Sequence, residues 1–152
     1  DLAALTVETI SRRVPDGLRA GVDIGYSGPR GNVLVEGNPP ALRDILDNLI
    51  DNAILYTGEG HAVTVMVEAL ETGGARLSVE DDGPGVPEAF LHRLGERFFR
   101  VPSGGPDGSG LGLAIVRRIA EQHGASLNFG RAAAGGLQVT ITLPPPLKVD
   151  ST

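Results

Sequence analysis

The chain of 152 residues carries a formal net charge of −6 and contains no cysteine. Its length favours a single domain with room for a two-layer core. The acidic balance argues against a nucleic-acid or anionic-membrane surface, since those partners need a basic stripe, and the lack of cysteine excludes disulfides and thiolate zinc sites.

The apolar spacing of residues 2–13 predicts an amphipathic helix that is interrupted near Pro15 and Gly17, because proline and glycine disfavour a helix interior. Residues 22–26 and 32–37 are predicted to form two short strands joined by a turn. After Asn38, two prolines suit the first turn of a helix whose apolar residues recur at helical spacing as far as Thr57.

Residues 61–70 and 75–82 are predicted to form a β-hairpin. The following stretch, residues 83–110, is rich in glycine and proline, with one short helical piece at 89–94; such a long irregular segment is usually disordered or functional. A helix over residues 111–123, stopped by Gly124, and a closing hairpin of residues 125–130 and 136–143 complete the chain.

These elements amount to five or six strands, mostly antiparallel neighbours, and three helices. The predicted fold class is therefore α+β: a two-layer sandwich in which a mixed, mostly antiparallel sheet is covered on one face by helices.

The second helix carries a pair of asparagines. At about 100° per residue, Asn48, Asn52 and Tyr56 line one edge of its apolar stripe. A single asparagine here would more often make a capping or interhelical hydrogen bond, but a pair favours amide oxygens that bind a Mg²⁺ completed by substrate phosphates. Tyr56 would then lie against a planar base. The acidic residues expected on the solvated side of this helix are Asp44, Asp47 and Asp51.

An acidic turn, EDDGPGVP, follows the third predicted strand. The strand ends at Asp81, and the chain then turns through Gly83 and Gly85. Glycine lets the backbone approach a ligand closely, and the carboxylate can accept a hydrogen bond from an exocyclic amine. Taken alone, a turn of this kind is more often structural than functional.

Three glycines, Gly108, Gly110 and Gly112, stand at the start of the third long helix in GSGLGLAIV. Free backbone N–H groups and the helix dipole favour phosphate at such a position. The spacing fits neither a dinucleotide fingerprint, which needs G-x-G-x-x-G directly after a strand, nor a P-loop, which needs Gly-Lys-Ser/Thr.

The segment ERFFRV places Phe98 and Phe99 between Arg97 and Arg100. It is typical of a lid that packs apolar side chains when closed and offers guanidinium groups to phosphate. The alternative is an aromatic pair anchored in the core beside solvated arginines.

In this order and spacing, the four stretches resemble the N, G1, F and G2 boxes of the catalytic, ATP-binding domain of sensor histidine kinases, in the superfamily shared with gyrase, MutL and a heat-shock chaperone ATPase. The resemblance covers residues 33–143 and implies a Bergerat fold with a mobile ATP lid. It divides the chain into the end of a linker or first helix (1–20), the catalytic ATP-binding domain (21–144) and a flexible tail (145–152).

The resemblance also implies residue roles. Asn52 would bind Mg²⁺, Asn48 would assist at the phosphates, and Arg100 would act with both in catalysis. Tyr56 would stack on adenine, while Asp81 would accept a hydrogen bond from its amino group. The other expected nucleotide contacts are Gly83, Gly85, Arg97, Phe99, Gly108, Ser109, Gly110, Leu111 and Gly112.

Leu55 departs from the family pattern, which usually has lysine or arginine there. A phosphate-contacting cation is therefore missing, and Arg100 or Arg97 is expected to carry more of that role. The departure also leaves open a degenerate, non-catalytic nucleotide-sensing module. A serine kinase of the anti-sigma-factor type, which phosphorylates a small protein partner, is a further alternative.

Kinase chemistry is favoured over hydrolysis because Asn48 occupies the position where hydrolysing members carry a glutamate, and asparagine cannot act as a general base. The resemblance implies transfer of the ATP γ-phosphoryl to a histidine on a separate dimerisation domain of the same protein, and onward signalling to a response regulator. His61, His92 and His123 do not fit that acceptor. The full-length protein would be an inner-membrane sensor, with this fragment on the cytoplasmic side and without direct membrane contact.

Overall fold

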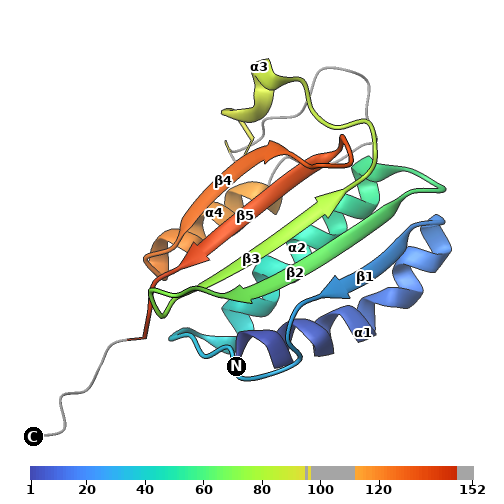
Figure 1. Cartoon of the computed structure of the whole chain (residues 1–152). Helices are drawn as coiled ribbons and strands as arrows, with labels where there is room; N and C mark the ends of the chain where they lie inside the picture. The colour runs from blue at the N-terminus through green and yellow to red at the C-terminus, as the bar shows by residue number, and fades with distance from the viewer. Residues whose placement is uncertain (95, 97–111, 147–152) are drawn as a thin grey trace, which may run out of the picture.

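A five-stranded sheet with helices against one face forms the domain, as a computed structural model shows for residues 1–94, 96 and 112–146 (Figure 1). The helices are α1 (Leu2–Ala20), α2 (Pro39–Thr57), α3 (Glu88–Leu91) and α4 (Gly112–Gln122). The strands are β1 (Asp23–Ser27), β2 (Ala62–Ala69), β3 (Ala75–Asp81), β4 (Ser126–Arg131) and β5 (Leu137–Leu143).

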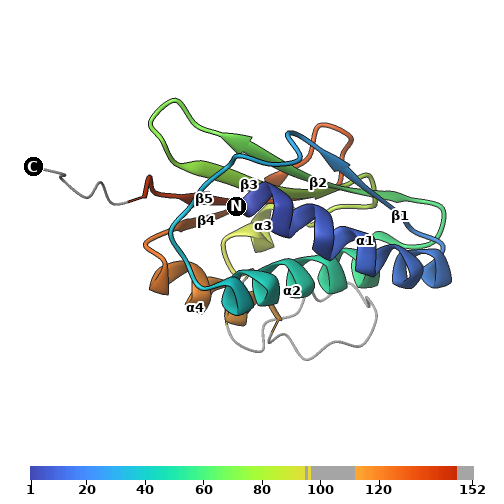
Figure 2. The ribbon, with the colours of Figure 1, turned by 90° about the horizontal axis from the view of Figure 1, so that it is seen from below.

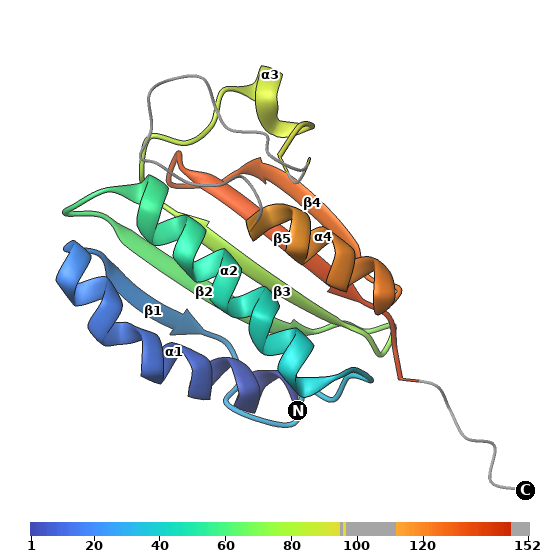
Figure 3. The same ribbon diagram turned by 180° about the vertical axis from the view of Figure 1, so that it is seen from behind.

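The sheet has the strand order β1-β2-β3-β5-β4. β1 lies parallel to β2, and the other three pairings are antiparallel. α1, α2 and α4 form one layer beneath the sheet, with α2 between the other two (Figures 2 and 3). The predicted α+β two-layer sandwich is thus confirmed.

The core lies between the two layers. Alternate residues of the central strands point toward the helices, so that on β2 Val63, Val65 and Val67 are buried while their neighbours are partly exposed. The helical face that meets them comes largely from α2, whose buried residues are Leu42, Ile45, Leu46, Leu49, Ile50, Ala53 and Thr57. This packing fixes the rotation of α2 and so decides which of its polar residues face away from the sheet.

The first helix is longer than the sequence predicts. α1 continues through Pro15 and ends only at Gly21, whose φ of 72° is left-handed. Tertiary packing holds its last turns: a Cβ on Gly17 would lie 2.7 Å from both Ile24 Cδ1 and the Val22 carbonyl oxygen. Close contact with β1 therefore outweighs the local cost of proline and glycine.

The strand predicted over residues 32–37 is wrong. This segment pairs with no strand and is instead fastened to the start of α1. Asp1 Oδ2 accepts a hydrogen bond from the Asn32 amide at 2.7 Å, and the Leu2 amide donates to the Val33 carbonyl at 2.7 Å. Backbone groups of this segment are hydrogen-bonded to the end of a helix rather than to a sheet edge.

Of the acidic residues predicted on the solvated side of α2, Asp51 is exposed and Asp47 is partly exposed, and both also pair with a residue of α1. Arg13 of α1 donates to Asp47 Oδ1 at 2.8 Å and pairs with Asp51 and Asp16, although only 15% of its side chain is exposed. Asp44 is exposed as expected. Among the described residues, no helix is long and apolar enough to cross a membrane.

Candidate nucleotide site

The acidic turn at the end of β3 presents a carboxylate with one oxygen committed to the protein and one open. Asp81 Oδ1 accepts hydrogen bonds from the amides of Gly83 at 2.9 Å and Leu137 at 3.4 Å. Within the described ranges, no donor reaches Oδ2. Burial raises the pKa of Asp81, and the two amide hydrogen bonds offset only part of that effect. The open oxygen can accept a hydrogen bond from a ligand amine.

Glycines surround this carboxylate closely. A Cβ on Gly136 would lie 2.1 Å from both Asp81 O and Asp81 Oδ1, and one on Gly83 would lie 3.2 Å from Asp81 Oδ1. Gly85 has a φ of 74°, and its Cβ position is 2.8 Å from the Gly135 carbonyl oxygen. Backbone therefore packs around Asp81 in a way that side chains would prevent.

The asparagines of α2 differ from each other. Asn48 Nδ2 donates to the Asp44 carbonyl oxygen at 2.8 Å, so the amino group of this side chain is bonded to the preceding turn of its own helix. Asn52 makes no hydrogen bond to any residue that the structure describes. Both side chains and Tyr56 are half-buried, as the predicted edge of the apolar stripe requires.

The start of α4 meets α2 at Asn48. The Cβ position of Gly112 lies 3.3 Å from Asn48 Oδ1, so a side chain there would crowd the amide. The first turn of α4, the C-terminal part of α2 and the end of β3 lie at the same end of the molecule (Figure 3). Three segments that are separate in the sequence thus converge on one region.

Much of the predicted lid falls outside the described residues. This applies to Arg97, Phe99, Arg100, Gly108, Ser109, Gly110 and Leu111. The structure brings together Asn48 with Gly112, and Asp81 with Gly83; Gly85 packs on Gly135, beside Gly136.

Sequence reasoning missed three residues that pack on the acidic turn. Gly136 and Leu137 contact it from the start of β5, and Thr57 packs against Gly83 from the end of α2. The Gly135-Gly136 pair was the available signal, but it reads equally well as an ordinary hairpin turn. Only the pairing of β3 with β5 places it beside the acidic turn.

A second acidic residue, Asp82, has a structural role at the edge of this region. Its Oδ1 accepts from the Ala62 amide at 2.8 Å and lies 3.1 Å from His61 Nδ1. The amide hydrogen bond, followed by the one with His61, lowers the pKa of Asp82. Through Oδ1 this carboxylate fixes the start of β2 against the end of β3.

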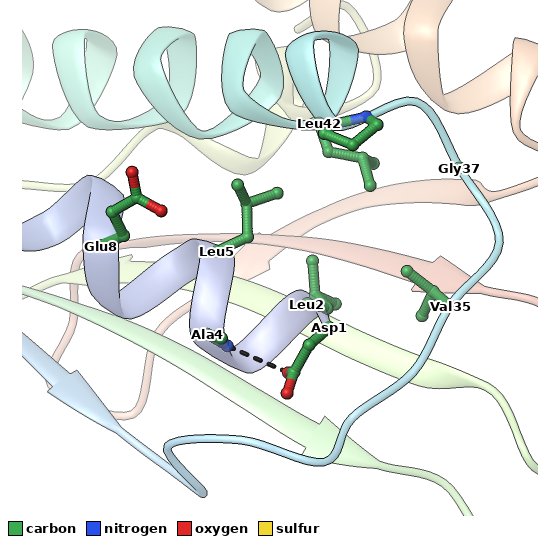
Figure 4. A pocket seen from close by; sticks show the side chains of 9 residues that line it. Asp1, Leu2, Ala4, Leu5, Glu8, Val35, Gly37 and Leu42 are labelled. Carbon is green, nitrogen blue, oxygen red and sulfur yellow. Dashed lines mark hydrogen bonds between the residues drawn. The ribbon is translucent and has the colours of Figure 1, made fainter.

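A cavity of about 250 Å³ lies elsewhere, at the N-terminal end of α2 (Figure 4). Leu2, Leu5, Val35 and Leu42 supply its apolar wall, and Glu8 stands at its rim. The Asp1 carboxylate beside it is engaged by the Ala4 amide. Acidic groups over an apolar wall do not suit a polyphosphate, so this cavity is not the predicted site.

The described residues contain no cluster of three or more His, Cys, Asp or Glu side chains that could hold a metal. A Mg²⁺ would therefore have to be held mainly by phosphate oxygens and water, with neutral protein oxygens in support. The free amide of Asn52 fits that requirement.

Residues 37–147 match the family described as "Histidine kinase-, DNA gyrase B-, and HSP90-like ATPase". The chain is 40% identical over 124 residues to the sensor protein QseC of Salmonella typhimurium, which covers 82% of this chain and 26% of that protein. It is 33% identical over 141 residues to the sensor-type histidine kinase PrrB of Mycobacterium tuberculosis, covering 91% of this chain and 31% of PrrB.

Solved structures give the same result. The catalytic domain of histidine kinase ThkA superposes with a TM-score of 0.81 at 26% identity, covering 94% of this chain and 93% of that one. The mycobacterial sensor histidine kinase MprB gives a TM-score of 0.78 at 31% identity, covering 93% and 97%.

The chain therefore belongs to the histidine kinase-, DNA gyrase B- and HSP90-like ATPase family, as a catalytic domain of the sensor histidine kinase type. It spans about a quarter of the length of the curated QseC relative.

Proposed function

We propose that this domain binds ATP with Mg²⁺ and donates the γ-phosphoryl group to a histidine on a separate dimerisation domain of the same protein. The observation that carries the proposal is the carboxylate of Asp81, whose Oδ2 is open and which is surrounded by glycine backbone. It stands at the end of β3, at the same end of the molecule as the C-terminal part of α2 and the first turn of α4 (Figure 3). The family match supports ATP as the ligand.

In this proposal each end of the nucleotide has its own protein groups. Asp81 Oδ2 accepts from the adenine amine, and Tyr56 lies against the ring. Asn52 contributes an amide oxygen to Mg²⁺, and Asn48 with the glycines at the start of α4 binds phosphate. Arg97, Phe99, Arg100, Gly108, Ser109, Gly110 and Leu111 complete the site from the lid side.

The transfer step needs little covalent chemistry from this domain. A ring nitrogen of the acceptor histidine forms a bond to the γ-phosphorus while the bond from that phosphorus to the β,γ-bridging oxygen breaks, and ADP leaves. The ring proton passes to a base outside this chain. The domain contributes positioning and stabilisation of charge on the phosphoryl oxygens.

Hydrolysis by water is disfavoured by the residues near the phosphate end. Asn48 donates its amide to the Asp44 carbonyl and cannot accept a proton near neutral pH. The carboxylates of Asp47 and Asp51 are turned toward Arg13. We expect slow ATP hydrolysis from the purified domain, and brisk turnover would contradict the proposal.

We further propose that α1 belongs to the folded domain, because Leu2 and Ile10 are buried in its core, and that residues 145–152 are a tail.

The partners proposed are the dimerisation domain and a response regulator, in a protein anchored in the inner membrane with this domain on the cytoplasmic side. The names of the QseC and PrrB relatives, a sensor protein and a sensor-type histidine kinase, support a sensing role for the whole protein.

The test has two stages. Calorimetric titration with a non-hydrolysable ATP analogue, with and without Mg²⁺, should show binding that Mg²⁺ strengthens. Labelled ATP is then added with the separately expressed acceptor domain, and label should appear on its histidine. Binding without transfer would indicate the degenerate nucleotide-sensing module, whereas no binding would refute the proposal as a whole.

Arg100→Ala should weaken ATP binding or phosphotransfer markedly, since Leu55 leaves Arg100 as a main source of positive charge for the phosphates. Arg12→Met, on the exposed face of α1, is the control for loss of one positive charge. Wild-type behaviour of Arg100→Ala in both assays would refute the role given to Arg100.

A further inference from the structure

Thr57, the last residue of α2, has an unusual hydroxyl. Its side chain is buried, with only 2% of the residue exposed, yet Oγ1 makes no hydrogen bond within the part of the chain that the structure describes. It is the one buried side-chain oxygen or nitrogen there without a partner. A buried hydroxyl left unpaired destabilises the folded state, so such a group calls for an explanation.

Two other buried threonines show what the usual solution looks like. Thr6 Oγ1 donates to the Leu2 carbonyl at 2.7 Å, and Thr9 Oγ1 donates to the Leu5 carbonyl at 2.8 Å. Both use the carbonyl four residues earlier in their helix, the common arrangement for threonine inside a helix. Thr57 has the same option at Ala53 and does not take it.

The surroundings of Thr57 point to the base-binding end of the site. The Cβ position of Gly83 lies 2.8 Å from the Thr57 carbonyl oxygen, 3.0 Å from Thr57 Cα and 3.2 Å from Asp81 Oδ1. Thr57 and Asp81 therefore pack on the same glycine, which carries no side chain to separate them. The second carboxylate oxygen of Asp81 is also without a donor among the described residues.

From these observations we propose that Thr57 is a positioning residue for base recognition, whose hydroxyl donates to the Asp81 carboxylate when a purine base occupies the site. A hydroxyl this deeply buried cannot touch the base itself, so it acts through Asp81. When the turn closes on the ligand, Asp81 Oδ2 accepts from both the Thr57 hydroxyl and the adenine amine, since a carboxylate oxygen can accept two hydrogen bonds. This inference rests on the ATP-binding function proposed above.

The arrangement favours adenine over guanine. A carboxylate held in a fixed position accepts from the 6-amino group of adenine but repels the 6-carbonyl oxygen of guanine. A second donor that fixes the carboxylate sharpens this difference, because the carboxylate can no longer rotate away from the carbonyl oxygen. The Thr57 hydroxyl should therefore matter for selectivity as well as for affinity.

Thr57→Val tests the inference, since valine keeps the shape and removes the hydroxyl. Affinity for a non-hydrolysable ATP analogue, measured by calorimetry, should fall about 5- to 10-fold, the net worth of one ordinary hydrogen bond. ADP should lose affinity by the same factor, and the preference for ATP over GTP should narrow. Thr57→Ser should retain most of the affinity.

Thermal unfolding of the free variants supplies the second readout. Thr57→Val should leave the melting temperature unchanged or raised, because no hydrogen bond is lost, whereas the matched control Thr9→Val should lower it and leave nucleotide affinity unchanged. Unaltered affinity in Thr57→Val, or a loss confined to the triphosphate, would overturn the inference. A wild-type domain that binds no ATP analogue would instead overturn the proposed function.

Discussion

The polar groups at the two ends of α2 differ in whether they are hydrogen-bonded within the protein. At the N-terminal end, the Asn38 side-chain oxygen caps the helix by accepting from the Ala41 backbone amide. The backbone amide of Asn38 donates to His123 Nε2 at 3.1 Å. His123 Nδ1 lies 2.8 Å from the Ile119 carbonyl oxygen, so the ring joins α2 to the end of α4. Near the C-terminal end, the buried Thr57 hydroxyl has no partner in the described structure, and no described residue bonds to Asn52 or to Oδ2 of the neighbouring Asp81 on β3.

This contrast distinguishes fold from function within one helix. Polar groups that hold elements together are hydrogen-bonded even without a ligand, because buried groups without a hydrogen bond destabilise the fold. Groups that await a ligand remain open at the expense of stability. The comparison makes a general prediction: substitutions at the N-terminal end should lower stability, whereas those at the C-terminal end should lower nucleotide affinity with little loss of stability.

The largest effect is expected from Asp81→Asn. Asparagine can still accept from the Gly83 and Leu137 amides, but its amino group would face the adenine amine, donor against donor. Affinity for an ATP analogue should fall about 100-fold or more, as for loss of a charged hydrogen bond that leaves an unpaired donor behind. Calorimetry measures the loss, and affinity within a few-fold of wild type would remove Asp81 from the site.

The same variant has a stability signature in the free domain. Burial raises the pKa of Asp81 above its unfolded value, so the charged form is disfavoured in the folded state and this penalty is present above the folded pKa. Asp81→Asn should therefore be the more stable protein at neutral pH. The advantage should vanish as pH falls below the ordinary aspartate value of about 3.9, because Asp81 is then protonated in both states.

The next largest effect is expected from Gly136→Ala. Its Cβ would lie 2.1 Å from Asp81 O and 2.6 Å from Asp81 C, both backbone atoms that cannot move aside cheaply. We expect a loss of about 2 kcal/mol in the free energy of unfolding, together with weaker nucleotide binding as the turn is displaced. Gly130→Ala, where no atom lies within 4 Å of the added carbon, is the matched control for denaturant unfolding.

Asn52→Ala should separate affinity from stability. Its amide bonds to no described residue, and alanine is the better helix former, so the free domain should be as stable as wild type or slightly more so. Analogue affinity with Mg²⁺ should drop about 10-fold, and affinity without Mg²⁺ should change little. Asp44→Ala, an exposed change on the same helix, controls for surface effects. An equal loss with and without the metal would argue against Asn52 as a ligand.

The sequence predicted the parts of this molecule that follow local rules. The positions of α2, α4 and the two hairpins follow from periodicity, capping and turn residues, and the asparagine pair and acidic turn from their residue types. The prediction from sequence failed where a contact with a residue distant in the sequence determines the local structure. Pro15 remains helical because Gly17 packs on β1, and the segment before Asn38 is not a strand because Asp1 holds it. Thr57 and Gly136 could not be assigned to the site before the pairing of β3 with β5 was known.

The smallest effect is expected from Arg13→Met, at the junction of α1 and α2. Arg13 bridges Asp16, Asp47 and Asp51, so its loss should lower the free energy of unfolding by about 1 kcal/mol while nucleotide affinity stays unchanged. Arg12→Met, which removes the same charge from an exposed position, should cost less.

The difference between these two variants should depend on pH. Hydrogen bonds from Arg13 and then Arg19 lower the pKa of Asp16, so this carboxylate stabilises the fold above its unfolded pKa, and the contribution is lost as pH falls through the lower folded value. Parallel urea titrations at neutral pH and at about pH 3 should therefore show the gap between Arg13→Met and Arg12→Met closing in acid. A gap that persists would mean that Arg13 acts through the packing of its aliphatic stem between α1 and α2, and this junction would then depend on shape more than on charge.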